Sequence, residues 1–472
     1  MYLPIYSHLR HLEEEKRVPF HMPGHKRKSS GLFDQIENID ITEIEGYDNL
    51  HDPEGIIRQS MDVTKKIYET KESWYLVNGT TVGILASISA LCQPGDKILM
   101  ARNCHKSVYN IVRLLHLHPF YCYPSENNKY DILEDIGGQE RERIKEIIKQ
   151  NPDIKAVIIT SPTYEGIVSD IFSLKQILNP YRIPLIVDEA HGAHMIFHDY
   201  FPKSAVECGA DIVIQSTHKT LPSFTQTAVL HLCSDIISAE KIQEMLSVYE
   251  TSSPSYILMA SAEYGIMFMH NNPEKIDEYV DNLMEFRHKC GQFKHIHLIS
   301  ENDMNCFEYD KSKLVFSVKN TGLDGKKLFQ ILLSKYQLEL EMATATYGIA
   351  MTSVCDGQED FERLFQALYE IDLQLEKNEI KQIPPTWRFT SEKQMESWEA
   401  MERGTENVCF LDSVGRICAN YIFLYPPGIP LLVPGEKIVK EIVENLSFYL
   451  YNGYNVSGMD HDIIKVLKEE DR

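Results

Sequence analysis

Short continuous apolar runs alternate with amphipathic stretches through the middle of the chain. Four runs are too short for helices and have the composition of buried strands: 97–100, 156–160, 185–187 and 211–215. Between them, the stretch 140–150 carries Ile144, Ile147 and Ile148 on one side and charged residues on the other, which is helical spacing. This alternation predicts an α/β fold with a mostly parallel sheet that helices cover on both faces.

The pattern changes towards both ends of the chain. The first 70 residues are rich in His, Pro and charged residues, and we expect them to be irregular. Beyond about residue 290 the pattern is mixed, with a strand expected at 314–318 and a helix at 326–336. The sequence therefore predicts four parts: an N-terminal arm (1–70), a large cofactor-binding domain (71–290), a small α+β domain (291–390) and a C-terminal domain (391–472).

Composition narrows the function classes. The 47 Lys and Arg residues against 69 Asp and Glu residues give a net charge of −22, which argues against nucleic acid and anionic membrane surfaces as partners. The N-terminus lacks the pattern of a signal peptide, and no run approaches the length of a membrane span. The ten scattered cysteines include no Cys-x-x-Cys pair and indicate reduced thiols. These features predict a cytoplasmic protein.

Three groups of reactive residues follow apolar runs, at the strand ends where open parallel sheets bind ligands. Asp188 follows 185–187, Lys219 with its neighbours Ser216 and His218 follows 211–215, and Asn78-Gly79-Thr80-Thr81 follows 75–77. Each has a structural alternative: a solvated acid, a surface lysine or a capped helix start. Together they provide an amine for a Schiff base, an acid for a pyridine nitrogen and a helix start for a phosphate. Pyridoxal 5′-phosphate requires these three anchors.

Several further segments occur in a characteristic order. They are His21-Met22-Pro23-Gly24-His25-Lys26, Asn78-Gly79-Thr80-Thr81, Ser161-Pro162-Thr163-Tyr164-Glu165-Gly166, Asp188-Glu189-Ala190-His191-Gly192-Ala193-His194, Ser216-Thr217-His218-Lys219, Thr251-Ser252-Ser253-Pro254-Ser255-Tyr256, Tyr425-Pro426-Pro427-Gly428-Ile429-Pro430 and Pro434-Gly435-Glu436. With this set the chain resembles, over most of its length, the bacterial ornithine/lysine/arginine decarboxylase family. That family consists of pyridoxal-phosphate enzymes with the aspartate aminotransferase-like fold, fold type I.

The resemblance implies a role for each matching residue around the cofactor. Lys219 matches the Schiff-base lysine, and Asp188 matches the acid that pairs with the pyridine nitrogen. His105 matches the side chain that stacks on the ring, with Ala190 on the opposite face and His191 among the cofactor contacts. The residues matching the phosphate site are Gly79, Thr80, Thr81, Ser216 and His218. Ser252 and Ser253 match a segment that reaches the phosphate of the neighbouring subunit, which implies a homodimer with shared active sites.

The resemblance also implies a reaction, the decarboxylation of a basic L-amino acid to an amine that feeds polyamine metabolism. Arginine and lysine are preferred to ornithine as the substrate, and the residues that bind its distal cation are not identified. The proton for Cα comes from His218 or from Lys219, and the sequence leaves both open. Only a brief stretch precedes residue 21, so we expect a short form without the N-terminal wing domain of larger members, as a dimer or a dimer of dimers.

Other functions use some of the same residues. An aminotransferase would share Lys219, Asp188 and the threonines, and a regulator that binds the cofactor without catalysis would share Lys219. Pairs such as His21 and His25 resemble metal ligands, but no Cys or further acid completes a site and the family needs no metal. We therefore predict no metal. The lysine-containing turn at 322–327 lacks the spacing of a nucleotide loop.

Overall fold

The computed structural model of the 472-residue chain describes residues 1–15, 19–23, 25–27, 36–376, 391–424 and 428–471. These residues form two units, each built from several segments of the chain. Unit 1 comprises Met1–Leu91, Ile171–Asp281 and Ser353–Gly357, and unit 2 comprises Cys92–Asp170, Asn282–Thr352 and Gln358–Arg472. Each unit combines segments that the predicted boundaries separate, and those boundaries stay a prediction.

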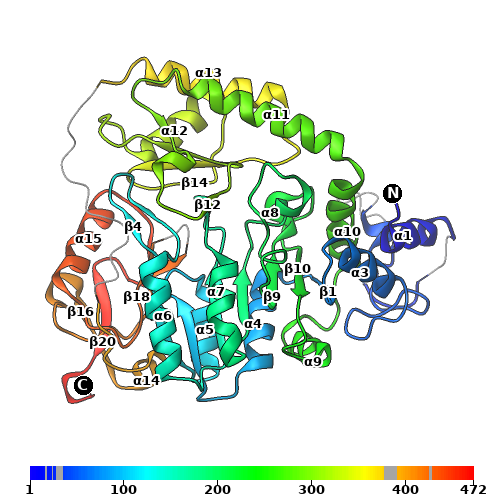
Figure 1. The fold of residues 1–472 in the computed structure, drawn as a ribbon, viewed down its shortest axis with the longest axis horizontal. Coiled ribbons are helices and arrows are strands. Elements are labelled where there is room, and N and C mark those ends of the chain that lie inside the picture. Colours follow the sequence, from blue (N-terminus) through cyan, green and yellow to red (C-terminus); the bar gives the residue numbers. More distant parts are fainter. Residues whose placement is uncertain (16–18, 24, 28–35, 377–390, 425–427, 472) are drawn as a thin grey trace. The chain divides into compact units, whose positions relative to one another are not determined.

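Unit 1 contains four strands in the order β1, β10, β9, β8. Their bounds are Glu72–Leu76 (β1), Ala228–Leu232 (β10), Ile212–Gln215 (β9) and Leu185–Asp188 (β8). Strands β8 and β9 are parallel, whereas β10 runs antiparallel to both β9 and β1. It follows that β1, β8 and β9 all point the same way, so their carboxyl ends lie along one edge (Figure 1).

These strands are buried on both faces, which explains the continuous apolar runs in the sequence. All residues of β8, β9 and β10 are buried. Helix α4 (Gly79–Leu91) packs closely on this layer, because a Cβ built at Gly83 would lie 2.8 Å from Leu76 Cδ1 and 2.9 Å from Ile214 Cγ2. A larger side chain at Gly83 would therefore push the helix away from β1 and β9.

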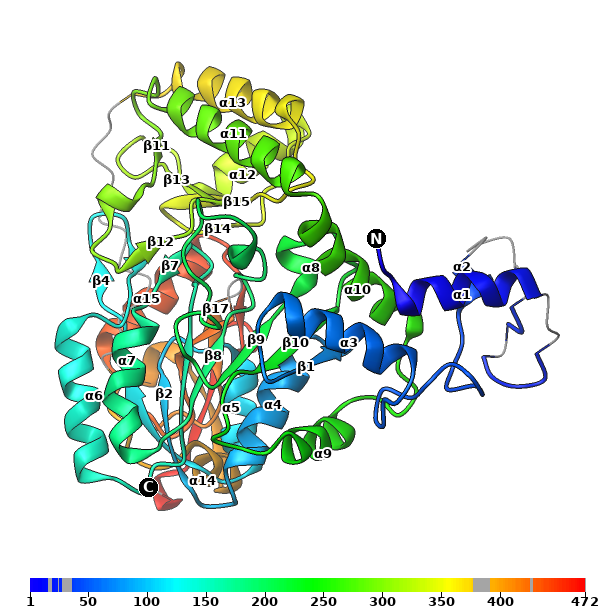
Figure 2. The same cartoon turned by 45° about the vertical axis from the view of Figure 1, so that its right-hand side comes forward.

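Unit 1 also contains further helices. They are α1 (Pro4–Glu15), α2 (Ile36–Ile39), α3 (Ile56–Ile67), α7 (Ile171–Leu178), α8 (Thr217–Thr220), α9 (Ala239–Tyr249) and α10 (Tyr256–Asn271). Helices α1, α3 and α10 lie side by side (Figures 1 and 2). Helix α11 (Pro273–Cys290) follows and continues into unit 2.

The expectation of an irregular first 70 residues is wrong, because α1 and α3 are regular amphipathic helices of 12 residues each. Helix α1 buries Ile5 and Leu9 at helical spacing. The Glu263 carboxylate on α10 accepts hydrogen bonds from the backbone N–H groups of Ile5 and Tyr6, each at 3.1 Å. Its negative charge therefore lies at the N-terminus of α1, where the helix dipole favours it.

Unit 2 contains a parallel group of strands and an antiparallel sheet. In the parallel group, β2 (Lys97–Ala101) pairs with both β3 (His118–Cys122) and β6 (Ala156–Thr160), and helices α5 (Lys106–Leu114) and α6 (Gly138–Gln150) belong to the same region. The antiparallel sheet has the order β11 (His297–Leu298), β13 (Lys313–Ser317), β15 (Tyr347–Met351), β14 (Met342–Ala343). Helix α12 (Gly325–Tyr336) packs on β14 and β15, and α13 (Gln358–Asp372) lies beside the part of α11 that belongs to unit 2 (Figures 1 and 2). The strands and helices predicted at 97–100, 140–150, 156–160, 314–318 and 326–336 are thus confirmed.

The C-terminal part of unit 2 forms a separate hydrophobic cluster. Its elements are α14 (Ser397–Glu402), β16 (Thr405–Cys409), β17 (Ile422–Leu424), β18 (Ile429–Leu432), α15 (Lys440–Tyr451), β19 (Val456–Ser457) and β20 (Ile463–Leu467). The short strands β4 (Glu126–Asn127), β5 (Ile132–Leu133), β7 (Ile167–Val168) and β12 (Glu308–Tyr309) complete the unit. Buried Arg102, which follows β2, donates to both carboxylate oxygens of Glu436 and so joins this part to the rest of unit 2.

No helix among the described residues combines the length and the apolar character that crossing a membrane requires.

Candidate active site

The residues predicted to anchor a ligand converge at one edge of the strands of unit 1. Asp188 ends β8, Ser216 follows β9, and Gly79 opens α4, with two residues between it and the end of β1. Strand pairing places Asp188 opposite Ile214 and Leu76 opposite Ala228, and β1, β8 and β9 point the same way. The segments that carry the acid, the lysine and the helix start therefore lie at one edge of these strands.

The turn before α4 is fixed by side chains from distant parts of unit 1. The Glu250 carboxylate accepts the Val77 N–H at 2.6 Å, and the Gln226 side chain donates to the Val77 carbonyl. The Thr251 N–H donates to Asn78 Oδ1 at 3.1 Å. Gly79 itself has φ +72°, a left-handed conformation that glycine adopts without strain. This turn presents the first N–H groups of a 13-residue helix to the site.

Ser216 has an open hydrogen-bonding capacity. It is fully buried between β9 and α8, and its Oγ makes no hydrogen bond within the described part of the chain. Thr80 is half-buried and Thr81 is exposed at the start of α4. A buried hydroxyl without a partner costs free energy, so a polar ligand atom at this point would stabilise it.

Asp188 is a buried carboxylate, with 3% of the residue exposed. Burial raises its pKa, whereas the nearby charge of Lys219 acts in the opposite direction. The backbone N–H of Ala190 donates to Asp188 Oδ1 at 3.2 Å. A cationic group of a ligand next to this carboxylate would further favour its charged form.

Lys219 and His218 lie in the short helix α8 and have different partners. Lys219 Nζ lies 3.0 Å from His191 Nε2, and Lys219 is half-buried. His218 Nδ1 lies 2.7 Å from the Thr227 carbonyl oxygen, which can only accept a hydrogen bond. Burial lowers the pKa of His218, and the charge of Lys219 lowers it further. The neutral ring therefore carries its proton on Nδ1 and leaves Nε2 as an acceptor.

A row of buried polar side chains runs beneath this edge. Thr70, Ser73, His231, Gln215 and Glu189 are linked in this order by contacts of 2.8, 2.8, 3.3 and 2.6 Å. Burial lowers the pKa of His231 to about 3, so its ring is neutral. The four links are consistent with one direction of donation, in which each side chain donates a hydrogen bond to the next and Gln215 donates to the Glu189 carboxylate.

The Glu189 end of the row is tightly held. Its carboxylate also accepts the Ser204 hydroxyl and the Ala205 N–H, both at 2.6 Å. Burial raises the pKa of Glu189 to about 7 despite these bonds. Because Glu189 follows Asp188 and Gln215 precedes Ser216, the bond between Glu189 and Gln215 fixes the spacing of two candidate site residues.

Other predicted site residues belong to other segments, and some of the predicted segments include residues that the structure does not describe. His105 belongs to unit 2, where its ring accepts the Ser107 N–H at the start of α5. Ser252 and Ser253 are exposed and follow Thr251, whose N–H reaches Asn78. The predicted segments at 21–26 and 425–430 include residues 24 and 425–427, which lie outside the described residues.

Sequence reasoning missed several residues that shape the site. Glu250, Gln226 and Thr227 contact it through bonds that span 173, 149 and 9 positions of the chain, respectively. The sequence does contain a signal for Glu189. A second acid directly after Asp188 at the end of a buried strand is itself expected to be buried and to need hydrogen-bond donors. For Gln226 and Glu250 the sequence contains no comparable signal.

The described residues fit pyridoxal 5′-phosphate on three counts. Ser216 Oγ and the first turn of α4 offer hydrogen-bond donors to a phosphate. The buried carboxylate of Asp188 suits a protonated pyridine nitrogen, and Lys219 supplies an amine within electrostatic reach of that carboxylate. Within the described residues, no group of three or more His, Cys, Asp or Glu side chains has the arrangement of a metal site.

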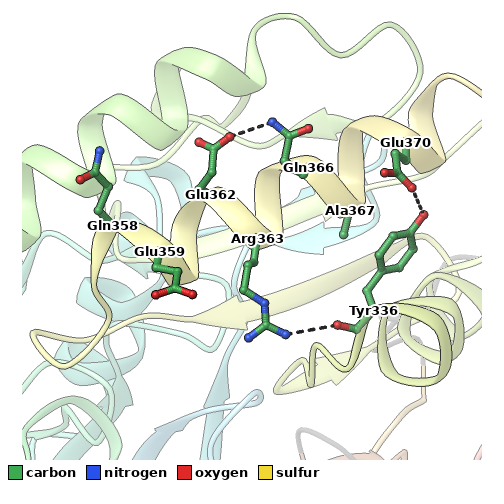
Figure 3. Close-up of a pocket in the computed structure, with 8 residues that line it drawn as sticks. All are labelled: Tyr336, Gln358, Glu359, Glu362, Arg363, Gln366, Ala367 and Glu370. Carbon is green, nitrogen blue, oxygen red and sulfur yellow. Dashed lines mark hydrogen bonds between the residues drawn. The ribbon is translucent and has the colours of Figure 1, made fainter.

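A separate hollow in unit 2 has no part in this arrangement. It has a volume of about 600 Å³ and lies along α13 and the end of α12 (Figure 3). Most of the residues that line it are of charged or polar types, among them Tyr336, Glu362, Arg363 and Glu370. None of the predicted site residues belongs to it, so it is not the candidate active site.

Comparisons with known proteins show the family of this chain. Residues 3–415 match the family model described as Orn/Lys/Arg decarboxylase, major domain, and residues 378–472 match that of the family's C-terminal domain. The arginine decarboxylase of Bacillus subtilis (strain 168) is 31% identical over 484 residues, covering 99% of this chain and 98% of the relative.

Solved structures share the fold. The crystal structure of the Francisella novicida lysine decarboxylase LdcF matches with a TM-score of 0.85 at 20% identity, covering 99% of this chain and 81% of that one. Alanine–glyoxylate aminotransferase from Nostoc sp. matches over 67% of this chain and 86% of its own, with a TM-score of 0.52 at 13% identity. The predicted aspartate aminotransferase-like fold of type I is therefore confirmed.

Proposed function

We propose that this chain, which belongs to the Orn/Lys/Arg decarboxylase family of pyridoxal-phosphate-dependent carboxy-lyases, decarboxylates arginine or lysine, in preference to ornithine. The single observation that supports the site assignment best is the position of Lys219. Its amine lies at the carboxyl edge of the strands of unit 1, close enough to Asp188 for their charges to interact. When bound, the cofactor supplies an electron-withdrawing ring that accepts the electron pair left when carbon dioxide departs.

Asp188 is proposed to pair with the pyridine nitrogen. A buried carboxylate raises the proton affinity of a nitrogen beside it, because charge attraction is strong where water is excluded. The Ala190 N–H fixes the orientation of this carboxylate, which supports the proposal. Ala190 is buried and is proposed to contact one face of the ring.

The phosphate is proposed to bind at Gly79, Thr80, Thr81 and Ser216. Backbone N–H groups and the positive end of the α4 dipole favour an anion there. The Ser216 hydroxyl would gain the hydrogen bond that it lacks within the described structure. His218 is proposed to close this side of the site with a neutral ring.

Lys219 is proposed to attach the cofactor and then to supply the proton that replaces the carboxylate at Cα. His218 is less suited to this step, because the Thr227 carbonyl holds its single proton on Nδ1. Its Nε2 carries no proton to donate. The choice between the two residues, which the sequence leaves open, therefore favours Lys219.

The remaining roles rest on the family resemblance. His105 is proposed to stack on the cofactor ring, and Ser252 and Ser253 are proposed to reach the phosphate of a second subunit. Both serines are exposed, which is compatible with contact across a dimer interface. A homodimer or a dimer of dimers with shared sites is thus part of the proposal. The net charge of −22 suits cationic substrates and products, because negative potential raises the local concentration of cations.

The test is a steady-state comparison of kcat/KM for arginine, lysine and ornithine with the holoenzyme and no keto acid. We expect release of carbon dioxide and the matching amine, with arginine or lysine preferred. Negligible kcat/KM for all three would refute the proposed substrate class. Turnover that appears only after addition of 2-oxoglutarate, without carbon dioxide, would instead identify an aminotransferase.

A further inference from the structure

His191 contacts the proposed catalytic amine. It lies in the turn after β8, is 3% exposed, and places Nε2 at 3.0 Å from Lys219 Nζ. The sequence assigns it only as one of the cofactor contacts. The distance is that of a hydrogen bond, so this ring and the amine share a proton between two defined atoms.

The chemistry of the pair fixes the direction of this bond when Lys219 is charged. An ammonium group has donors only, so His191 must then accept at Nε2 and carry its own proton on Nδ1. Asp188, from β8, and His218, from α8, are ionisable groups that also interact with Lys219. Asp188 favours the charged amine, and His218 is neutral. His191 Nε2 is thus a hydrogen-bond acceptor within 3.0 Å of the amine.

The turn that carries His191 has little room to move. A Cβ built at Gly192 would lie 2.6 Å from Glu189 Cγ and 2.7 Å from Met195 Sδ, so the turn is packed against its own ends. The Gly192 N–H donates to the Glu189 carbonyl at 2.9 Å. Since the Glu189 side chain is itself held by Ser204, Ala205 and Gln215, the ring of His191 starts from a fixed backbone.

We propose that His191 is a positioning residue whose Nε2 accepts a hydrogen bond from the Lys219 amine once that amine is released from the cofactor. The bond holds the ammonium of Lys219 in one orientation, with a proton directed for transfer. Before that transfer the bond from Cα to the carboxylate carbon breaks, carbon dioxide leaves and the electron pair of the bond stays on the Cα side. A proton moves from Lys219 Nζ to Cα, which leaves the amine neutral. This inference rests on the proposed function.

Two substitutions distinguish the proposed role of His191 as a hydrogen-bond acceptor from a role in which only its aromatic ring contacts the cofactor. His191→Gln keeps an acceptor near the position of Nε2 but has no ring, whereas His191→Phe keeps a ring without an acceptor. We expect His191→Phe to lower kcat by about 10²-fold with little change in KM, and His191→Gln to retain most of the parent kcat. His198→Gln is the matched control in the same segment, since His198 is partly exposed and faces Asp277 rather than Lys219.

A spectroscopic titration gives a readout that does not depend on turnover. In the protein without cofactor, the Lys219 amine is unattached, and added pyridoxal 5′-phosphate gains the visible absorbance of a Schiff base faster as pH rises and that amine loses its proton. Loss of the acceptor should move the midpoint of this rise to lower pH by about one unit in His191→Phe and by less in His191→Gln. If His191→Phe does not fold, His191→Leu is the acceptor-free variant.

Three outcomes would overturn the inference. They are parent-like kcat and midpoint in the acceptor-free variant, an active Phe variant beside an inactive Gln variant, and equal effects in the His198→Gln control. Failure of the proposed function is seen separately, because the parent protein itself would then release no carbon dioxide. A parent that decarboxylates and a Phe variant that titrates normally would reject the role of His191 alone.

Discussion

Two buried polar clusters of this molecule differ in how completely their hydrogen bonds are used. In unit 2, Arg102 donates to both oxygens of Glu436, to the Tyr109 hydroxyl and to the carbonyls of Pro430 and Leu431. In unit 1, Ser216 Oγ is buried without a hydrogen bond among the described residues. We call the Arg102–Glu436 cluster closed, because its charged groups are hydrogen-bonded to each other. We call the candidate site around Ser216, Asp188 and Lys219 open, because the Ser216 hydroxyl can still bind a ligand atom.

The polar groups of the closed cluster stabilise the fold, whereas those of the open cluster are available to bind a ligand. In a closed cluster, hydrogen bonds between the buried groups offset the free energy of removing their charges from water. An open one leaves part of that cost uncompensated until a ligand binds. Removal of a side chain should therefore have opposite consequences for stability and for ligand binding in the two clusters.

The largest expected effect is that of Lys219→Ala on the open cluster. Removal of the attachment amine and proton donor should lower the decarboxylation rate by about 10³-fold or more and abolish the visible absorbance of the bound cofactor. The unfolding temperature of the protein without cofactor should change little, because the lysine is half-buried and does not close a structural cluster. Unchanged absorbance in this variant would reject the assignment of Lys219.

Arg102→Leu, in contrast to Lys219→Ala, should mainly lower the stability of the fold. It leaves Glu436, which is 3% exposed, without its cationic partner, and the expected loss in the free energy of unfolding is about 3–5 kcal/mol. Urea unfolding measures this loss. The double variant Arg102→Leu/Glu436→Leu should recover much of it, since no buried charge then remains. A stable single variant would show that the cluster is not closed in solution.

Substitution of Glu250 tests whether the buried charge of a carboxylate next to the open cluster lowers the free energy of unfolding. Burial raises its pKa from 4.5 to about 7, so the folded protein loses stability as pH rises from about 4.5 through 7. Glu250→Gln keeps an acceptor for the Val77 N–H and removes the charge. The variant should therefore gain up to about 3 kcal/mol over the parent on going from about pH 5 to about pH 8. Urea unfolding at both pH values checks this, and a difference that does not grow with pH would contradict it.

The smallest effect is expected for a matched pair of buried serines. Ser216→Ala removes a hydroxyl without a hydrogen bond, so the free energy of unfolding should stay the same or rise, while the Kd for pyridoxal 5′-phosphate should increase about tenfold. Ser204→Ala removes a hydroxyl that donates to Glu189 and should lower stability by about 1–3 kcal/mol with little change in that Kd. An exchange of these two outcomes would mean that the comparison of open and closed groups is wrong.

Much of this site could be predicted from the sequence because it depends on local pattern. Strands β8 and β9 are buried on both faces, so their runs are continuous and apolar, and the residues that follow them must lie at one sheet edge. Asp188 and Lys219 were found by this rule, and the motifs then indicated the family.

The remainder depends on contacts between distant parts of the chain. The helical spacing of Ile5, Leu9 and Leu12 is a local signal for α1, but the contact of Glu263 with the start of that helix spans 258 positions and has no local signal. The bond between Glu250 and Val77 and the tautomer of His218 are likewise set by tertiary neighbours. The same holds for the pairing of His191 with Lys219, which joins the turn after β8 to the short helix α8 after β9.

The most direct test of the central claim is chemical trapping of the cofactor in the holoenzyme. Borohydride reduction followed by digestion and peptide mass spectrometry should place a pyridoxal-phosphate adduct on Lys219, in the peptide that also contains His218. An adduct on another lysine, or no adduct in a protein that decarboxylates arginine or lysine, would contradict the account.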